Sequence, residues 1–309
     1  MELRHLRYFR TVAEELNMTR AANRLYIAQP PLSRQIRQLE TELGVDLFER
    51  HPRGLRLTTA GDYFRRQTVH ILDRVDAAIS GTQALASAGG NVIRIGFVPS
   101  FLYEELPALI QRLRTHHDIS LTFTELMTVE QVHALKTDRI DIGFGRLIID
   151  DPAIQQETLF EEPLVAVLPA AHRLAARQPS LADLAAEPLI VYPDKPRPSY
   201  ADTVLEHFRT RDIAVDLAQQ ANGLQTAIGL VASGIGFTLV PERVRRMGRE
   251  DIAFCDLADR GVTSPVLASL RRESSSDALD ELLAILHGLV NADRERGRLI
   301  SVDAAADPE

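Results

Sequence analysis

The chain has 309 residues, of which 45% are hydrophobic and 25% charged, a composition typical of a globular protein of roughly two or three domains. The formal net charge is −8, but residues 1–66 contain 12 arginines and 8 acidic residues, so this part carries +4 and the remainder −12. A basic N-terminal part on an acidic body is compatible with nucleic-acid binding. The only cysteine is Cys255, which excludes an intramolecular disulfide, a cysteine metal cluster and a two-cysteine redox switch.

The first 40 residues predict three helices. Residues 3–16 have apolar side chains at helical spacing, and residues 19–40 predict a helix-turn-helix. Thr19 is expected to cap the first helix of this motif, residues 26–28 to form the turn, and Pro30 to fit the first turn of the second helix. One face of that second helix has polar and basic groups and no acid, which suits base edges and phosphates in a major groove. We expect its DNA contacts to be Gln29, Pro30, Ser33, Arg34 and Arg37. The alternative is an ordinary two-helix corner with a solvated basic face.

Residues 45–58, VDLFERHPRGLRLT, predict a β-hairpin wing. Two short apolar runs surround a Pro-Arg-Gly turn. Arg50 and Arg53 lie close to that turn, where they would contact phosphates.

These segments together resemble a known family. MELRHLRYF, AANRLYIAQPPLSRQIRQLETELGVDLFER and LTTAG are similar to the N-terminal winged helix-turn-helix of LysR-type transcriptional regulators, and the remaining length and element order also match that family. IGFVPSFLY, GFGR and RPSYAD most resemble the branch that controls aromatic-compound catabolism (benzoate, catechol, muconate and phenylpropionate regulators). The resemblance implies double-stranded promoter DNA, a small-molecule effector and RNA polymerase as partners. It also implies a homotetramer and no cofactor.

A long helix is predicted from residue 58 to about residue 87. Its apolar positions, which include Ile71 and Ile79, recur in steps of three and four over more than three heptads. We expect this helix to pair with its copy in a homodimer; the alternative is a single helix lying on its own domain. The expected domains are a DNA-binding domain (1–58), a linker helix and hinge (59–90), an effector-binding domain (91–300) and a loose tail (301–309).

From residue 92 strands and helices alternate, which predicts parallel sheets covered by helices on both faces. Expected strands are 92–98, 119–125, 140–144, 162–168, 189–192, 237–240 and 263–270. Expected helices are 101–114, 128–136, 200–210, 222–233 and 276–291. Two α/β subdomains with a cleft between them follow. The family resemblance implies the same architecture, that of a periplasmic binding protein.

Ligands of open α/β sheets bind beyond the carboxyl ends of the strands. The expected effector-binding residues at those ends are Pro99, Ser100, Thr128, Arg146, Pro198, Ser199 and Tyr200. Ser100, Thr128 and Ser199 each stand at a predicted helix start, and three such starts beside an arginine suit a carboxylate; each one alone is more often a plain cap. In muconate-responsive regulators the matching positions hold the acid. Pro99 departs from them, standing where those regulators can carry a hydroxyl, and it leaves a phenylpropionate-type effector as an alternative.

The alternation from 92 to 291 would also suit a small α/β enzyme. The sequence lacks a GxGxxG after a strand, a P-loop, a GxSxG and an HExxH, so no catalytic residue or metal ligand is expected. Residues 217–241 carry no charge, but their glutamines and glycines favour a buried helix and a core strand over a membrane span. The protein is therefore expected to be cytoplasmic.

Overall fold

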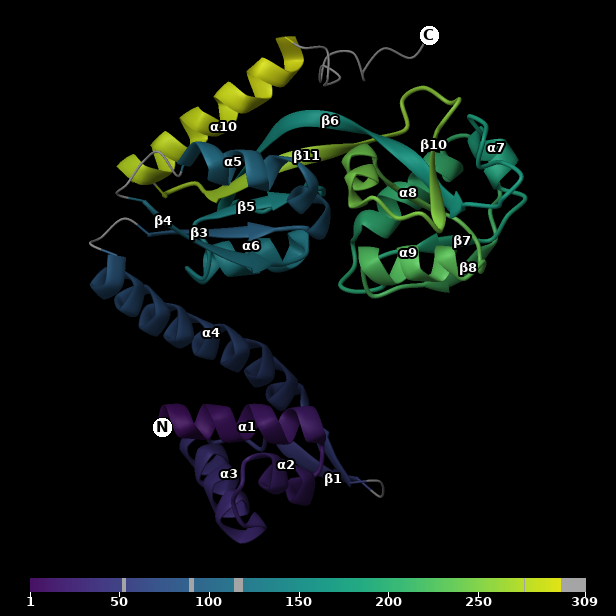
Figure 1. Ribbon diagram of the computed structural model, residues 1–309. Coiled ribbons are helices and arrows are strands. Elements are labelled where there is room, and N and C mark those ends of the chain that lie inside the picture. Colours follow the sequence, from purple (N-terminus) through teal and green to yellow (C-terminus); the bar gives the residue numbers. More distant parts are fainter. Residues whose placement is uncertain (52–53, 89–91, 114–118, 275, 296–309) are drawn as a thin grey trace. The chain divides into compact units, whose positions relative to one another are not determined.

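The computed structural model describes residues 1–51, 54–88, 92–113, 119–274 and 276–295 (Figure 1). Arg53 and the predicted tail at 301–309 lie outside these ranges. The chain divides into two compact units, Met1–Gln83 and Ala84–Glu309, and each is described by itself.

The N-terminal unit is a winged helix-turn-helix, as predicted. Its elements are α1 (Leu3–Glu15), α2 (Met18–Arg24), α3 (Gln29–Leu43), β1 (Phe48–His51), β2 (Gly54–Leu57) and α4 (Thr59–Ala88), the last of which extends beyond the unit. One apolar core joins the three short helices and the hairpin, and its fully buried members include Phe9, Leu32 and Leu39. Phe9 also contacts the ring of Phe48 on β1, at 5.3 Å between centroids, which fixes the wing against α1.

The first helix of the helix-turn-helix begins two residues earlier than expected. Thr19 is not the cap of α2, because Asn17 accepts hydrogen bonds from the N–H groups of Thr19 (2.9 Å) and Arg20 (3.0 Å). Leu16 ends α1 in the left-handed conformation, which leaves Asn17 alone to connect the two helices. At α3 the expectation is confirmed: Pro30 lies in the first turn, and Gly44 ends the helix at φ +70°.

The second unit contains two α/β subdomains. Subdomain I has β3 (Val92–Phe97), η1 (Pro99–Tyr103), α5 (Glu105–Leu113), β4 (Ser120–Glu125), α6 (Thr128–Lys136), β5 (Ile142–Gly145) and α10 (Asp277–Glu295). Subdomain II has α7 (Leu181–Leu184), β7 (Leu189–Val191), α8 (Tyr200–Arg209), β8 (Leu217–Gln220), α9 (Leu224–Ala232), β9 (Thr238–Pro241), η2 (Glu242–Met247) and β10 (Ile252–Asp256). Each subdomain has its own apolar core.

Two long strands cross from one subdomain to the other, β6 (Ile154–Pro169) and β11 (Thr263–Arg271) (Figure 1). The first half of β6 pairs with β11, and its second half pairs with β9 and β10. The seven-stranded sheet has the order β10-β6-β11-β5-β3-β4, with β9 beside β6, and β7 pairs with β8 separately. The expected strand 263–270 is confirmed as β11, and it returns the chain to subdomain I.

The sheet differs from the prediction in its strand directions. β4, β3 and β5 are parallel to one another, but β11 pairs antiparallel with β5, and β6 pairs antiparallel with β11. β8, β10 and the first half of β6 were not predicted as strands, because their residues alternate weakly or are mostly exposed. The uncharged stretch 217–241 forms β8, α9 and β9, and among the described residues no helix is long and apolar enough to span a membrane.

Candidate functional site

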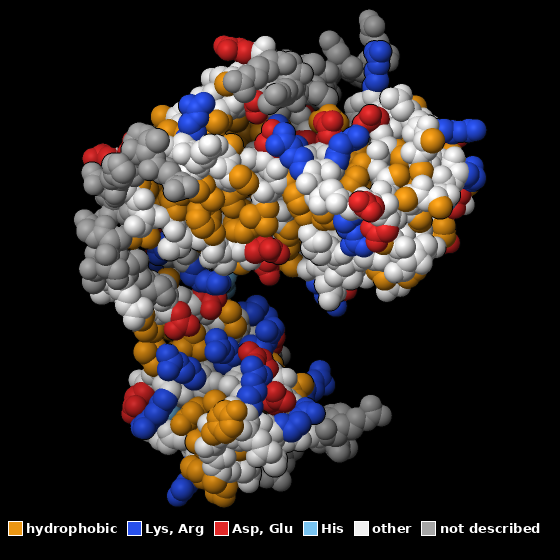
Figure 2. All heavy atoms as spheres, in the orientation of Figure 1, with side chains coloured by type: hydrophobic (Ala, Val, Ile, Leu, Met, Phe, Trp, Pro, Cys, Tyr) orange, Lys and Arg blue, Asp and Glu red, His pale blue; other side chains and the backbone are white. Residues whose placement is uncertain are grey.

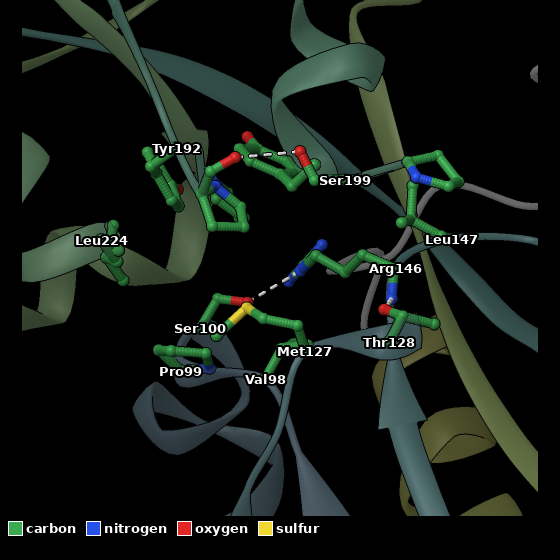
Figure 3. Close-up of a pocket in the computed structure, with 15 residues that line it drawn as sticks. Val98, Pro99, Ser100, Met127, Thr128, Arg146, Leu147, Tyr192, Ser199 and Leu224 are labelled. Atoms are coloured by element: carbon green, nitrogen blue, oxygen red, sulfur yellow. Dashed lines mark hydrogen bonds between the residues drawn. The ribbon is translucent and has the colours of Figure 1, made fainter. Parts of the chain in front are cut away.

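A pocket lies between the two subdomains, and its empty space, part of which is open to solvent, is about 500 Å³ (Figure 3). All seven predicted effector-binding residues line the pocket. The other lining residues, which were not named among the effector-binding positions, are Val98, Met127, Leu147, Tyr192, Pro193, Gly223, Leu224 and Pro241. Three of them, Val98, Met127 and Leu147, directly neighbour a predicted position, and for these three adjacency was the available signal.

Arg146 organises the side of the pocket formed by subdomain I. Its Nε donates to the Ser100 hydroxyl at 2.8 Å, and its backbone N–H donates to the Thr128 hydroxyl at 3.1 Å (Figure 3). A hydroxyl oxygen that accepts a hydrogen bond keeps its own O–H to donate. Ser100 and Thr128 can therefore both present O–H donors to a ligand.

The expected capping roles of these two hydroxyls are wrong. Ser100 lies inside the 3-10 turn η1, and α5 begins only at Glu105. Met127 occupies the N-cap of α6, and Thr128 is the first helical residue. Similarly, α9 begins at Leu224, two residues later than the predicted start at Asn222.

The GFGR motif brings Thr128 close to the strand that carries Arg146. A Cβ atom added at Gly145 would lie 2.7 Å from both Oγ1 and Cγ2 of Thr128. Only a glycine allows this approach, so Gly145 is part of the geometry that places the Thr128 hydroxyl.

Glu162 is the main functional residue that sequence reasoning missed. Its side chain is 2% exposed and forms an ion pair with Arg146, which is itself buried. The second carboxylate oxygen accepts from the N–H of Arg243 at 2.9 Å. The positive charge of Arg146 is thus largely balanced before any ligand arrives. An acid within the otherwise apolar second half of β6 was the only sequence signal.

The side formed by subdomain II is aromatic and uncharged. Ser199 caps α8 as predicted: its hydroxyl accepts from the N–H of Ala201 and donates to the Pro193 carbonyl at 3.0 Å. Tyr200 donates to the Leu239 carbonyl at 3.3 Å, and its ring centroid lies 5.1 Å from that of Tyr192. Burial raises the pKa of both phenols well above the ordinary value, so both are neutral. The Ser199 hydrogen is already used within the protein.

The exposed face of α3 carries the predicted DNA-contacting residues. Gln29, Pro30, Arg34 and Arg37 are exposed, Ser33 is half-buried, and the Gln29 amide donates to the Ser33 hydroxyl at 3.0 Å. Arg50 lies on β1, opposite Leu55. Figure 2 shows basic side chains gathered on the visible face of the N-terminal unit.

The predicted dimer seam on α4 is partly exposed and partly internal. Ile71 and Ile79 are 40% and 47% exposed, an unusual position for isoleucine in a lone chain. Thr68, one turn before Ile71 on α4, is fully buried.

Comparison with known proteins supports both units. Residues 3–62 match the bacterial regulatory helix-turn-helix of the lysR family, and residues 87–290 match the LysR substrate binding domain. The transcriptional regulator CatR of Pseudomonas putida is 50% identical over 93% of this chain and 98% of its own length. BenM of Acinetobacter baylyi is 39% identical over 89% of this chain and 92% of its own.

Solved structures agree with these matches. The crystal structure of CbnR, a LysR family transcriptional regulator, aligns with a TM-score of 0.72 at 29% identity, covering 93% of this chain and 99% of CbnR. The BenM effector binding domain with its effector benzoate aligns with a TM-score of 0.62 at 29% identity, covering 69% of this chain and 96% of that domain. The chain therefore belongs to the LysR family of bacterial transcriptional regulators, and it is a DNA-binding regulator with an effector-binding domain rather than an enzyme.

Proposed function

We propose that the pocket binds a small aromatic or unsaturated carboxylate and that this ligand controls how the protein acts on DNA. The observation that carries the proposal is the bonding around Arg146. Because Ser100 and Thr128 both accept from Arg146, both can aim O–H donors at a carboxylate next to a positive charge. The rings of Tyr192 and Tyr200, tilted by 39° to each other, offer aromatic surface to the rest of such a ligand. Benzoate, the effector of BenM, has this chemistry.

A neutral ligand is the competing proposal, because Glu162 already balances Arg146. Calorimetry on the full chain separates the two: carboxylates should bind, and the corresponding amides should not. Equal binding of acids and amides would refute the proposal that the ligand is a carboxylate.

Thr128→Val tests the hydroxyl itself. The substitution keeps the volume but removes a hydrogen bond to a charged acceptor, which should weaken carboxylate binding by roughly 1 to 3 kcal/mol, or about one to two decades. Thr128→Ser should retain binding. Thr137→Val is a matched control, because Thr137 lies at the other end of α6 and donates to the His133 carbonyl.

We also propose the DNA contacts. Gln29, Pro30, Ser33 and Arg34 of α3 would read base edges, while Arg37 and the wing arginines Arg50 and Arg53 would contact phosphates.

The exposed isoleucines of α4 support pairing with a second copy, and a tetramer of two such dimers would place several recognition helices on one promoter. RNA polymerase is the partner through which a promoter-bound regulator would act.

A further inference from the structure

Two consecutive residues of subdomain I reach across to subdomain II beside the pocket. The first is Tyr103, the last residue of η1. Its hydroxyl accepts from the side-chain amide of Gln225 on α9 at 2.7 Å, and its ring packs against the apolar core of subdomain II rather than that of its own subdomain. Tyr103 thus contacts subdomain II in two ways: its ring packs against the core, and its hydroxyl accepts a hydrogen bond.

The second is Glu104, which pairs with two arginines of η2. Its carboxylate oxygens lie 2.6 Å from Arg243 and 2.6 Å from Arg246. The side chains of Glu104 and Arg243 are only 16% and 10% exposed, so solvent screens this pair less than an ordinary surface ion pair. Arg243 also lies 4.5 Å from the ring centroid of Phe160, a residue of the crossing strand β6.

The residues that make these contacts lie within a few positions of residues that line the pocket. Ser100, on the same turn as Tyr103, lines the pocket; Leu224 lines it next to Gln225; and Pro241 lines it two positions before Arg243. Any movement that separates the pocket walls at these residues must break the contacts, and any ligand that draws the walls together strengthens them.

The connection between the subdomains permits such a movement. Only β6 and β11 run continuously through both, and their pairing shifts register between Val266 and Leu267. Parts of the lining are closed to solvent: Val98 and Tyr200, which come from opposite subdomains, are 8% and 7% exposed, whereas Pro198 is exposed. Separation of the subdomains, as in hinged domain closure, would increase access to the buried part of the pocket.

We propose that Tyr103, Glu104, Gln225, Arg243 and Arg246 form a clasp that holds the two subdomains closed over the pocket and opens to admit and release the effector. The clasp sets the ratio of open to closed protein before any ligand binds. Its effect on effector release rests on the function proposed above, but its effect on opening does not.

Opening can be measured without a ligand. Val98→Cys in a Cys255→Ala background places one thiol on the pocket wall of the full chain and removes the native one. A maleimide can reach this thiol only in the open form, so the reaction rate follows the open-to-closed ratio. Tyr103→Phe removes the hydrogen bond to Gln225 while keeping shape, and it should raise the rate about fivefold, the value expected for one net hydrogen bond. Glu104→Gln keeps shape but removes the negative charge that pairs with both Arg243 and Arg246, and it should raise the rate at least as much.

Ser233→Ala is the matched control. Ser233 follows α9, the helix that carries Gln225, and its hydroxyl donates to the Gly229 carbonyl within subdomain II, so its loss should leave the rate unchanged. Thermal melting confirms that each variant is folded. Equal maleimide rates in wild type, Tyr103→Phe and Glu104→Gln would overturn the clasp.

Benzoate provides the second measurement. If it binds, it should slow the maleimide reaction, and Tyr103→Phe should release it about fivefold faster than wild type. If neither benzoate nor any other carboxylate binds, the effector proposal fails, while the ligand-free rates still decide whether the clasp exists.

Discussion

Arg146 and Glu162 form a buried ion pair in the wall of the pocket, with side chains 5% and 2% exposed. Such a pair contributes little net stability, because desolvating both groups costs about as much as their attraction returns. Removing one partner is expensive, since a charge is then left buried without its counterion. A ligand carboxylate must therefore compete with Glu162 for Arg146.

Glu162→Gln should have two opposite effects. The folded protein should lose about 3 to 5 kcal/mol of stability, as measured by denaturant unfolding, because Arg146 loses its buried counterion. Carboxylate affinity should rise, because the ligand then no longer competes with the Glu162 carboxylate for Arg146. Glu157→Gln is the control, since Glu157 is exposed and pairs with His287. Unchanged carboxylate affinity would show that the ligand does not interact electrostatically with Arg146.

Acidification should destabilise the effector-binding unit through His207. This histidine on α8 lies 2.7 Å from the Thr263 carbonyl on β11, and burial lowers its pKa below the ordinary 6.5. The folded state favours the neutral ring. The contribution of His207 to the free energy of unfolding is therefore fully present above pH 6.5 and is lost as the pH falls through the lower folded-state pKa. Unfolding free energies measured between pH 7.5 and pH 5 should fall less steeply for His207→Gln. Identical slopes would rule out His207 as the cause.

The arginines of the DNA-binding face should contribute to the salt dependence of DNA affinity. Arg37→Ala and Arg53→Ala should weaken binding to all duplex sequences and reduce the slope of log affinity against log salt by about one each. Gln29→Ala should instead change sequence preference. Arg209→Ala is the control, because Arg209 is exposed on α8 and pairs with Glu206. A wild-type slope in either arginine variant would remove that residue from the phosphate interface.

Ile71→Asp tests the pairing of α4. Ile71 is 40% exposed in the single chain, and a second copy would bury it. An aspartate there would place an unpaired charge in the seam at a cost of several kcal/mol. Sedimentation should show dissociation, and operator affinity should collapse with it, whereas Ile71→Leu should assemble normally. An Ile71→Asp protein that stays associated at low concentration would place the interface elsewhere.

The sequence by itself determined the features that depend on neighbouring residues. Pro30 marks the start of α3, and the Pro-Arg-Gly turn marks the wing, because backbone dihedral preferences act within a few residues. Ser199 was recognised as a cap for the same reason: a side-chain oxygen capping a helix bonds to an N–H two or three positions on. The family resemblance rests on such local patterns.

Only the tertiary structure decided how the pocket is bonded. Ser100 and Thr128 looked like caps in the chain, but in the fold their hydroxyls bond to Arg146, which is 46 and 18 positions away. Glu162 and the Tyr103–Gln225 contact were equally invisible, the latter joining residues 122 positions apart. Polar side chains choose partners by burial: a charge or hydroxyl removed from water must bond to whatever group the packing brings near, and spacing along the chain does not encode which group that is.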